Sequence, residues 1–371
     1  MSGKWKLDEV RTGAIYETTF LVNPVEDSGF RFRATHLDGK RAPKVVLCDD
    51  ERIRPGIPCQ VRVVSITRPD RSDRGSIEAE FVKALPFRLE GVWLDPVVSK
   101  KIQILLESGL NILLDGPQGC GKTVVTRAIA VALGLDFVFF NCASVMEPTD
   151  FLATVQVRAS STGAPVTDFV KTELLTALER ALAEPRVRFL IFLDEFNRCQ
   201  ESARNVWMPA LDATRRVYNP ITNAFLPIPD NVQFIAAVNR GSEFSGTFGI
   251  DAAQLDRFAP IHMTYPPIEE EVKLLCARHP ELPKNLVHSV VSVADRVRKN
   301  PELSSGLSVR ATDEACVYLK HPLLEGQQRA MLKDILHSSF CGRFPGRPDD
   351  DASDAGMVWE TIQQTLDQER A

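Results

Sequence analysis

Two short segments carry residue types and spacings suited to holding and cleaving a phosphate chain. The first is a glycine-rich turn between an apolar strand pattern, Asn111–Leu114, and a helical pattern, Val124–Leu133, and it satisfies G-x-x-x-x-G-K-[ST]. Glycines let the backbone wrap around phosphate oxygens, the following helix adds its positive N-terminal dipole, and Lys122 adds a full charge. The expected phosphate-binding set is Gly116, Pro117, Gln118, Gly119, Cys120, Gly121, Lys122, Thr123 and Val124.

The second segment is an apolar run, Phe189–Leu193, that ends in the adjacent carboxylates Asp194 and Glu195. Taken alone, such an ending is as typical of a solvated strand end as of a catalytic site. Combined with the glycine-rich turn, it predicts the second half of a phosphate-cleaving site. We expect Thr123 and Asp194 to hold Mg²⁺, and Glu195 to polarise the attacking water.

The region that contains both segments, residues 91–267, alternates apolar strands with amphipathic helices. This alternation predicts an α/β fold with a largely parallel sheet flanked by helices. Polar residues follow the expected strands, as they do where ligands bind at the carboxyl ends of a sheet. The expected strands are Asn111–Leu114, Phe137–Asn141, Phe189–Leu193, Gln233–Val238 and Ile261–Tyr265.

Residues 1–90 read as short strands separated by turn residues, which predicts a small all-β domain. An oligonucleotide-binding (OB-like) barrel is one of several folds that share this pattern. The domain has 16 basic and 14 acidic residues, and Arg68, Arg71 and Arg74 cluster around one turn. A solvated hairpin tip is favoured over a phosphate-gripping edge for this cluster. The expected strands are Ala14–Val22, Phe30–His36, Lys44–Cys48, Cys59–Thr67 and Ser76–Val82.

The chain beyond the α/β region has helical periodicity, which predicts a helical lid over residues 268–345. Residues 346–371 begin with the acidic run Asp349–Asp354, and we expect an acidic tail with a short helix over Met357–Gln368.

Composition narrows the class of protein. A chain of 371 residues is long enough for several domains, and a net charge of −5 provides no large basic field for nucleic acid. The eight cysteines lack metal-ligand spacing, which favours a reducing compartment such as the cytoplasm. No apolar signal core or membrane-spanning run occurs in the sequence, so no membrane insertion is expected. For Cys120, inside the turn, the sequence leaves open the direction of the pKa shift.

These motifs together resemble AAA+ ATPases of the MoxR and dynein-related group, over roughly Trp93 to Lys320. The resemblance implies ATP and Mg²⁺ as cofactors. It also implies four further catalytic positions. Asn239, after the strand pattern Phe234–Val238, corresponds to sensor 1, which reads the γ-phosphate. Arg257, in Asp256-Arg257-Phe258, corresponds to an arginine finger that acts on the neighbouring subunit.

The remaining positions are implied more weakly. Arg310, at the start of a lid helix, resembles sensor 2, an arginine that contacts phosphate from the same subunit. Asn141 resembles the polar residue that restrains the catalytic glutamate. Two expected hairpins, residues 153–169 and 216–228, face the substrate side of the ring in this group. Tyr218 and Phe225 of the second hairpin either touch a substrate there or pack on the sheet.

Two functions are compatible with this resemblance. In the first, a MoxR-like homo-oligomer, expected to be a hexamer, remodels a protein client such as a von Willebrand factor A domain protein. In the second, a McrB-like motor of a restriction or defence system acts on DNA or RNA through its β-domain. The sequence Val238-Asn239-Arg240-Gly241 departs from the McrB-like branch and weakens a case for GTP.

Overall fold

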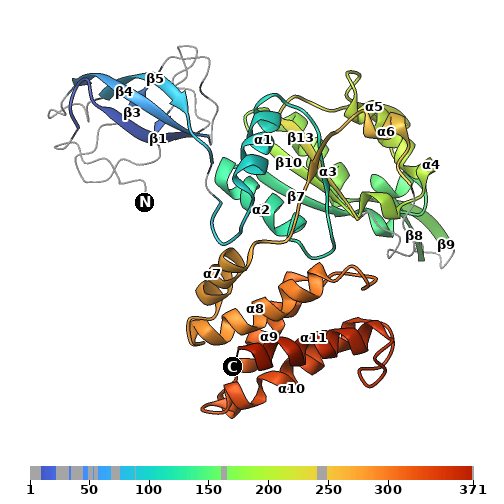
Figure 1. Cartoon of the computed structure of the whole chain (residues 1–371). Coiled ribbons are helices and arrows are strands. Elements are labelled where there is room, and N and C mark those ends of the chain that lie inside the picture. Colours follow the sequence, from blue (N-terminus) through green and yellow to red (C-terminus); the bar gives the residue numbers. More distant parts are fainter. Residues whose placement is uncertain are drawn as a thin grey trace.

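Three groups of elements follow one another along the chain: a sheet of strands β1–β5, an α/β core, and a set of helices (Figure 1). The structure is a computed structural model, and it describes residues 10–21, 33–34, 45–48, 53, 57–67, 76–87, 89–159, 165–239 and 249–369.

The N-terminal sheet has the strand order β2-β1-β4-β5-β3. Strands β3 and β5 pair in parallel, and the other pairs are antiparallel. Alternate residues of β4, including Val61 and Val63, are buried and face Ile77 in one small core. The expected cluster of Arg68, Arg71 and Arg74 lies outside the described residues. The strands are β1 (Ile15–Leu21), β2 (Arg33–Ala34), β3 (Val45–Leu47), β4 (Pro58–Thr67) and β5 (Ser76–Ala84).

The core sheet has the order β14-β6-β13-β10-β7, and all its strand pairs are parallel. This confirms the expected parallel sheet. The central strands β10 and β13 are apolar except at Gln233 and the terminal Asp194, because helices cover both faces and leave no solvated face to favour alternation. The strands are β6 (Ile112–Asp115), β7 (Asp136–Asn141), β10 (Phe189–Asp194), β13 (Val232–Val238) and β14 (Ala259–His262).

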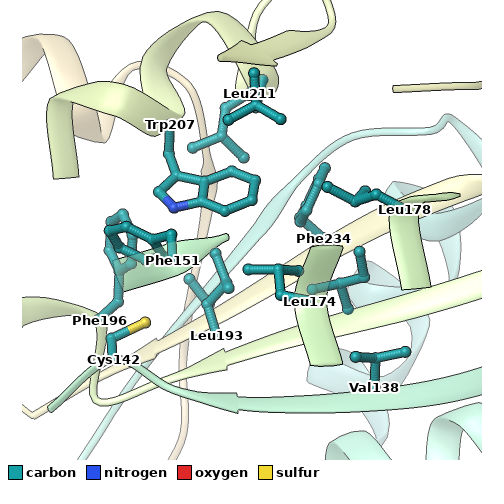
Figure 2. Packing of buried hydrophobic residues seen from close by; sticks show 14 of the residues in the cluster. Val138, Cys142, Phe151, Leu174, Leu178, Leu193, Phe196, Trp207, Leu211 and Phe234 are labelled. Carbon is teal, nitrogen blue, oxygen red and sulfur yellow. The ribbon is translucent and has the colours of Figure 1, made fainter. Parts of the chain in front are cut away.

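Helices cover the two faces of this sheet. On one face, α1 (Pro96–Glu107) and α2 (Lys122–Leu133) pack on Leu190 and Phe192 of β10. On the other face, α3 (Glu173–Ala183) and the segment around Trp207 pack on Ile191 and Leu193. Trp207 is fully buried and lies among Phe151, Phe234 and Leu211 in this layer (Figure 2).

Short helices connect these elements. The α-helical turns are α4 (Glu201–Arg204), α5 (Met208–Leu211) and α6 (Ala252–Leu255). The 3₁₀ turns are η2 (Cys142–Ser144), η3 (Pro148–Phe151), η4 (Phe196–Arg198), η5 (Asn205–Trp207), η6 (Pro322–Leu324) and η7 (Cys341–Arg343).

Two hairpins extend from the core, as the sequence predicts. Strands β8 (Ala153–Ala159) and β9 (Pro165–Lys171) precede α3, and β11 (Arg216–Asn219) and β12 (Ala224–Pro227) precede β13. In the second hairpin, Tyr218 and Phe225 pack edge to face on each other with ring centroids 5.8 Å apart, and both remain exposed.

The C-terminal helices share one hydrophobic core. They are α7 (Ile268–Arg278), α8 (Lys284–Lys299), α9 (Val309–Leu319), α10 (Gln328–Phe340) and α11 (Asp354–Gln368). Here the structure differs from the expected tail at residues 346–371. Val358, Ile362 and Leu366 recur every four residues and bury one stripe of α11, while the acidic run forms the turn before the helix and ends at its first residue, Asp354.

Within the described ranges, no helix is both long enough and apolar enough to pass through a membrane.

Candidate functional site

The carboxyl ends of the core strands place the predicted polar residues in one row. Along the sheet, β6 runs into the phosphate loop, β13 into Asn239, β10 into Asp194 and β7 into Asn141. Parallel strands put all these ends at the same edge. The distant segments therefore meet there because of strand order and direction.

The phosphate loop, residues 116–121, depends on its glycines for two separate reasons. Gly119 and Gly121 have φ of 71° and 100°, which side-chain-bearing residues rarely adopt. A Cβ on Gly119 would also lie 2.3 Å from the Cβ of Ser308, just before α9, and one on Gly116 would lie 2.5 Å from the Met263 carbonyl oxygen. The loop is thus held closely by its neighbours on both sides.

Lys122 lies at the start of α2 with its ammonium group directed back into the loop. Its Nζ donates to the carbonyl oxygens of Gly116 at 2.7 Å and of Pro117 at 3.0 Å. Burial lowers the pKa of Lys122, and the nearby carboxylate of Asp194 opposes that shift. The two carbonyl bonds balance the desolvated charge until a stronger anionic partner arrives.

Thr123 and Asp194 lie together, which answers whether the two motifs share one site. The Thr123 hydroxyl donates to Asp194 Oδ2 at 3.0 Å, although 70 residues separate them in the chain. A hydroxyl and a carboxylate are the hard oxygen ligands that Mg²⁺ prefers. The donor set therefore fits this ion.

Glu195 has a left-handed backbone, with φ of 52°. Such a conformation is uncommon for a residue with a side chain and turns the chain sharply after β10. Its carboxylate is 3.5 Å from Arg198 Nε, while its own N–H donates to Asp194 Oδ1 at 3.0 Å. Asn141 Oδ1 accepts from the N–H of Ala143 and caps the start of η2.

Asn239 is buried at the end of β13, and Asn197 fixes its backbone. Asn197 Nδ2 donates to the Asn239 carbonyl at 2.8 Å, and its Oδ1 accepts from the Asn239 N–H at 3.4 Å. This exchange ties η4, next to the acidic pair, to the strand that carries Asn239. The following Arg240 and Gly241 lie outside the described residues.

Cys120 is buried inside the loop. Burial raises its pKa, with the nearby charge of Lys122 acting in the opposite direction. The structure thus supplies the direction that the sequence left open: the thiol is stabilised over the thiolate.

A pocket runs from the loop to the C-terminal helices and the segment before α1. The phosphate end of this pocket is predicted by the sequence and contains Lys122, Asp194 and Asn239, together with Arg310 in α9. The other end is not predicted, because its side chains are ordinary in sequence and only meet through the fold. They are Gly91, Val92, Trp93, Pro266, Leu274, Arg278 and Asp313. Asp313 is held there by His279 Nε2 at 2.9 Å.

Arg257 lies away from this pocket. It lies two residues before Ala259, the first residue of β14, which pairs with Ile112 at the amino end of β6, so Arg257 belongs to the opposite edge of the sheet. Its guanidinium donates to the Ala253 carbonyl at 2.6 Å and lies 3.7 Å from Asp212. Arg257 therefore does not join the other predicted residues within one subunit.

The parallel core sheet, its phosphate loop and its acidic strand end are the features of a P-loop NTPase fold. Residues 111–258 match the family model described as AAA domain (dynein-related subfamily), so this segment is an AAA+ domain. Such a domain implies nucleotide binding and hydrolysis, usually with Mg²⁺.

Relatives add little about function. Uncharacterized proteins of Staphylococcus aureus strains USA300 and NCTC 8325 are each 25% identical over 171 residues, which is 46% of this chain and 62% of the relative. The matched part is thus less than two thirds of those proteins.

Among solved structures, a RuvB mutant of Thermotoga maritima has a TM-score of 0.41 and 13% identity, covering 73% of this chain and 69% of that one. The T. maritima RuvB Holliday junction branch migration motor has a TM-score of 0.39 and 14% identity, with the same coverage. Scores this low do not bear on what this chain binds.

The raised pKa of Cys120 makes its reactivity testable. The thiol remains protonated until the pH exceeds its raised pKa, so at pH 8 it has less reactive thiolate than an ordinary cysteine. We expect iodoacetamide to modify Cys120 at least about tenfold more slowly than the more exposed Cys276, and nucleotide to slow it further. Peptide mass mapping over time measures both rates. Equal rates would contradict this account of the loop.

Proposed function

We propose that this chain hydrolyses ATP within a ring of identical subunits and uses the cycle to remodel a protein partner. The observation that carries the ATPase assignment is the 3.0 Å contact between Thr123 and Asp194, with Lys122 and Glu195 as their chain neighbours. It brings a phosphate cradle, an oxygen donor set and a candidate base into one pocket.

Each residue has a part in the proposed reaction. Lys122 leaves the two loop carbonyls and binds the β- and γ-phosphates, where its charge offsets that of the phosphate oxygens. Bound between Thr123 and Asp194, Mg²⁺ would neutralise charge that develops on the transferred group. Glu195, released from Arg198, orients and polarises the attacking water. Asn239 places that water, and Arg310 contacts phosphate from the helical lid.

The position of Arg257 supports assembly. A strand of six residues such as β10 is roughly 20 Å long, and Arg257 and the phosphate loop lie at opposite edges of the sheet. The guanidinium is therefore too far from its own pocket, whereas an adjacent subunit could present it there. A ring places one such arginine at every interface, and a hexamer is the ring that the MoxR resemblance suggests.

The two hairpins support a protein partner over a nucleic acid. Val155, Val157 and Phe169 on β8–β9 are exposed, as are Tyr218 and Phe225 on β11–β12. Clustered exposed apolar side chains are typical of protein contacts, whereas phosphate backbones are held by basic ones. The resemblance to MoxR proteins makes a von Willebrand factor A domain protein the first candidate client.

Substitutions at the two motifs should separate binding from hydrolysis. We expect Lys122→Ala to lose ATP binding, because the ammonium group that lies against the phosphate loop is removed. Glu195→Gln keeps the side chain's size but removes its basicity, so it should bind ATP normally while kcat falls by about 10²- to 10³-fold. Fluorescent nucleotide titration and steady-state phosphate release measure the two quantities. Equal loss of ATP binding in both variants would contradict these roles.

Mixing two inactive variants tests whether Arg257 acts on the neighbour. We expect Arg257→Ala to lower kcat by about 10³-fold in an assembled ring. Added to Lys122→Ala subunits, it should regain up to about a quarter of the wild-type rate, because one interface in four then pairs an intact loop with an intact arginine. Each variant alone is the control. A mixture no more active than its components, in rings shown to contain both, would contradict the action of Arg257 on the neighbouring subunit.

The client hypothesis is tested on the β8–β9 hairpin. In ATP, Glu195→Gln should retain a client, and adding Val157→Asp should weaken that retention at least about tenfold, since a charge replaces exposed apolar surface. The matched control is Leu323→Asp, at an exposed apolar position in η6. Purified candidate clients are compared by pull-down. Salt-dependent binding of DNA or RNA by the whole chain, unaffected by Val157→Asp, would favour the McrB-like alternative.

A further inference from the structure

Tyr265 connects the helical lid to the phosphate loop. It lies between β14 and α7, in the segment that joins the core to the C-terminal helices. Its hydroxyl donates to the Gln118 carbonyl at 2.9 Å, and the Arg298 guanidinium carbon lies 4.4 Å from its ring centroid. One side chain therefore contacts the loop at its tip and the lid along its face.

The lid side of this contact is rigid. Arg298 makes a two-bond ion pair with Glu271, at 2.5 and 3.1 Å, and its Nε donates to the Leu307 carbonyl at 2.7 Å. Both charged side chains are almost completely buried, and Thr312 donates to Glu271 at 2.6 Å. A buried, fully bonded pair of this kind holds its geometry, because breaking it would strand a charge in the interior. The ring of Tyr265 thus stacks on a fixed plane shared by α7, α8 and α9.

The loop side has three consecutive carbonyls that all accept hydrogen bonds. Lys122 donates to Gly116 and Pro117, and Tyr265 donates to Gln118. A fourth contact follows, from the Val309 N–H to the Gly119 carbonyl at 3.3 Å. When Lys122 turns to a phosphate, its two bonds must break. The bond from Tyr265 has no such conflict and remains.

The Gln118 bond also fixes a donor of the loop. In a trans peptide the C=O and the next N–H point in opposite directions, so holding the Gln118 oxygen sets the direction of the Gly119 N–H. Backbone N–H groups in such loops bind the phosphates. Gly119 lines the pocket with a positive φ, and because glycine has no side chain it has more conformational freedom than other residues have. An external hydrogen bond at this peptide removes some of that freedom.

We propose that Tyr265 is a positioning residue that holds the Gln118–Gly119 peptide ready for phosphate and ties that arrangement to the position of the lid. The inference rests on the proposed ATP site. Tyr265 preorganises the loop for the phosphates that ATP and ADP share, and it takes no part in cleavage. A change in the conformation of the phosphate loop would therefore alter the position of the segment between β14 and α7, through the Tyr265 hydroxyl.

Tyr265→Phe tests this with a change of one oxygen, since the phenyl ring can still stack on Arg298. We expect the dissociation constants of ATP and ADP, and the KM for ATP, to rise together by about three- to tenfold, as for one lost hydrogen bond. The kcat value should stay within about twofold, because Glu195, Asn239 and Arg257 are untouched. The matched control is Tyr318→Phe, at an exposed position of α9, which should change none of these constants.

A second variant disturbs the same bond without altering Tyr265. A Cβ on Gly306 would lie 3.1 Å from the Tyr265 hydroxyl oxygen, a contact tight enough that Gly306→Ala should shift the hydroxyl by a few tenths of an ångström. We expect a smaller rise in both dissociation constants than for Tyr265→Phe, and little further rise in the double variant, because both changes act on one interaction. If the rise in each dissociation constant in the double variant equals the product of the rises in the two single variants, the proposal is wrong.

Other outcomes are equally decisive. If the wild-type chain binds ATP and Tyr265→Phe binds it equally well, the positioning role is wrong. Weaker ATP binding with unchanged ADP binding would instead make Tyr265 a reader of the γ-phosphate, and would also overturn it. If the folded wild-type protein binds neither nucleotide, the proposed function itself fails.

Discussion

The direction of the five core strands is the constraint on which the rest of this structure depends. Because all run in parallel, every strand ends at the same edge, and the order β14-β6-β13-β10-β7 sets which ends are neighbours. The hydrogen bond between Thr123 and Asp194 spans this edge over the end of β13, where Asn239 lies. If one strand were reversed, its polar end would lie at the opposite edge of the sheet, and the pocket would lack the residues that this strand supplies.

The phosphate loop is held from two directions with different consequences. Within the core, its own lysine satisfies two of its carbonyls, which gives a buried cation a temporary partner. From the lid, Ser308 approaches so closely that only glycine fits at position 119, and Tyr265 binds the preceding carbonyl. The segments that lead into the C-terminal helices therefore contact the phosphate loop directly. A movement of these helices must change the contacts of the loop, and a movement of the loop must change theirs.

The sequence predicted the phosphate end of the site well, because that chemistry is local. A turn that wraps phosphate needs glycines at fixed intervals, and a strand buried on both faces must be apolar until it reaches the carboxylates. The role of Asn197 cannot be seen in the sequence, since its bonds are to Asn239, 42 positions further along the chain. Trp93 and Asp313 carry no local signal, and only the folded chain brings them together. At the C-terminus, an acidic tail was predicted from the acidic run Asp349–Asp354. The apolar residues spaced four apart in α11 instead pack this segment into the core of the C-terminal helices.

Because Arg257 is separated from the pocket of its own chain, activity should depend on the concentration of the protein. If each centre is completed only where two copies meet, turnover per molecule rises with the amount of protein and vanishes on dilution. A cell could then silence the enzyme by keeping its copies scarce, and no inhibitor would be required. Scaffolds or clients that gather copies in one place would act as activators simply by crowding them.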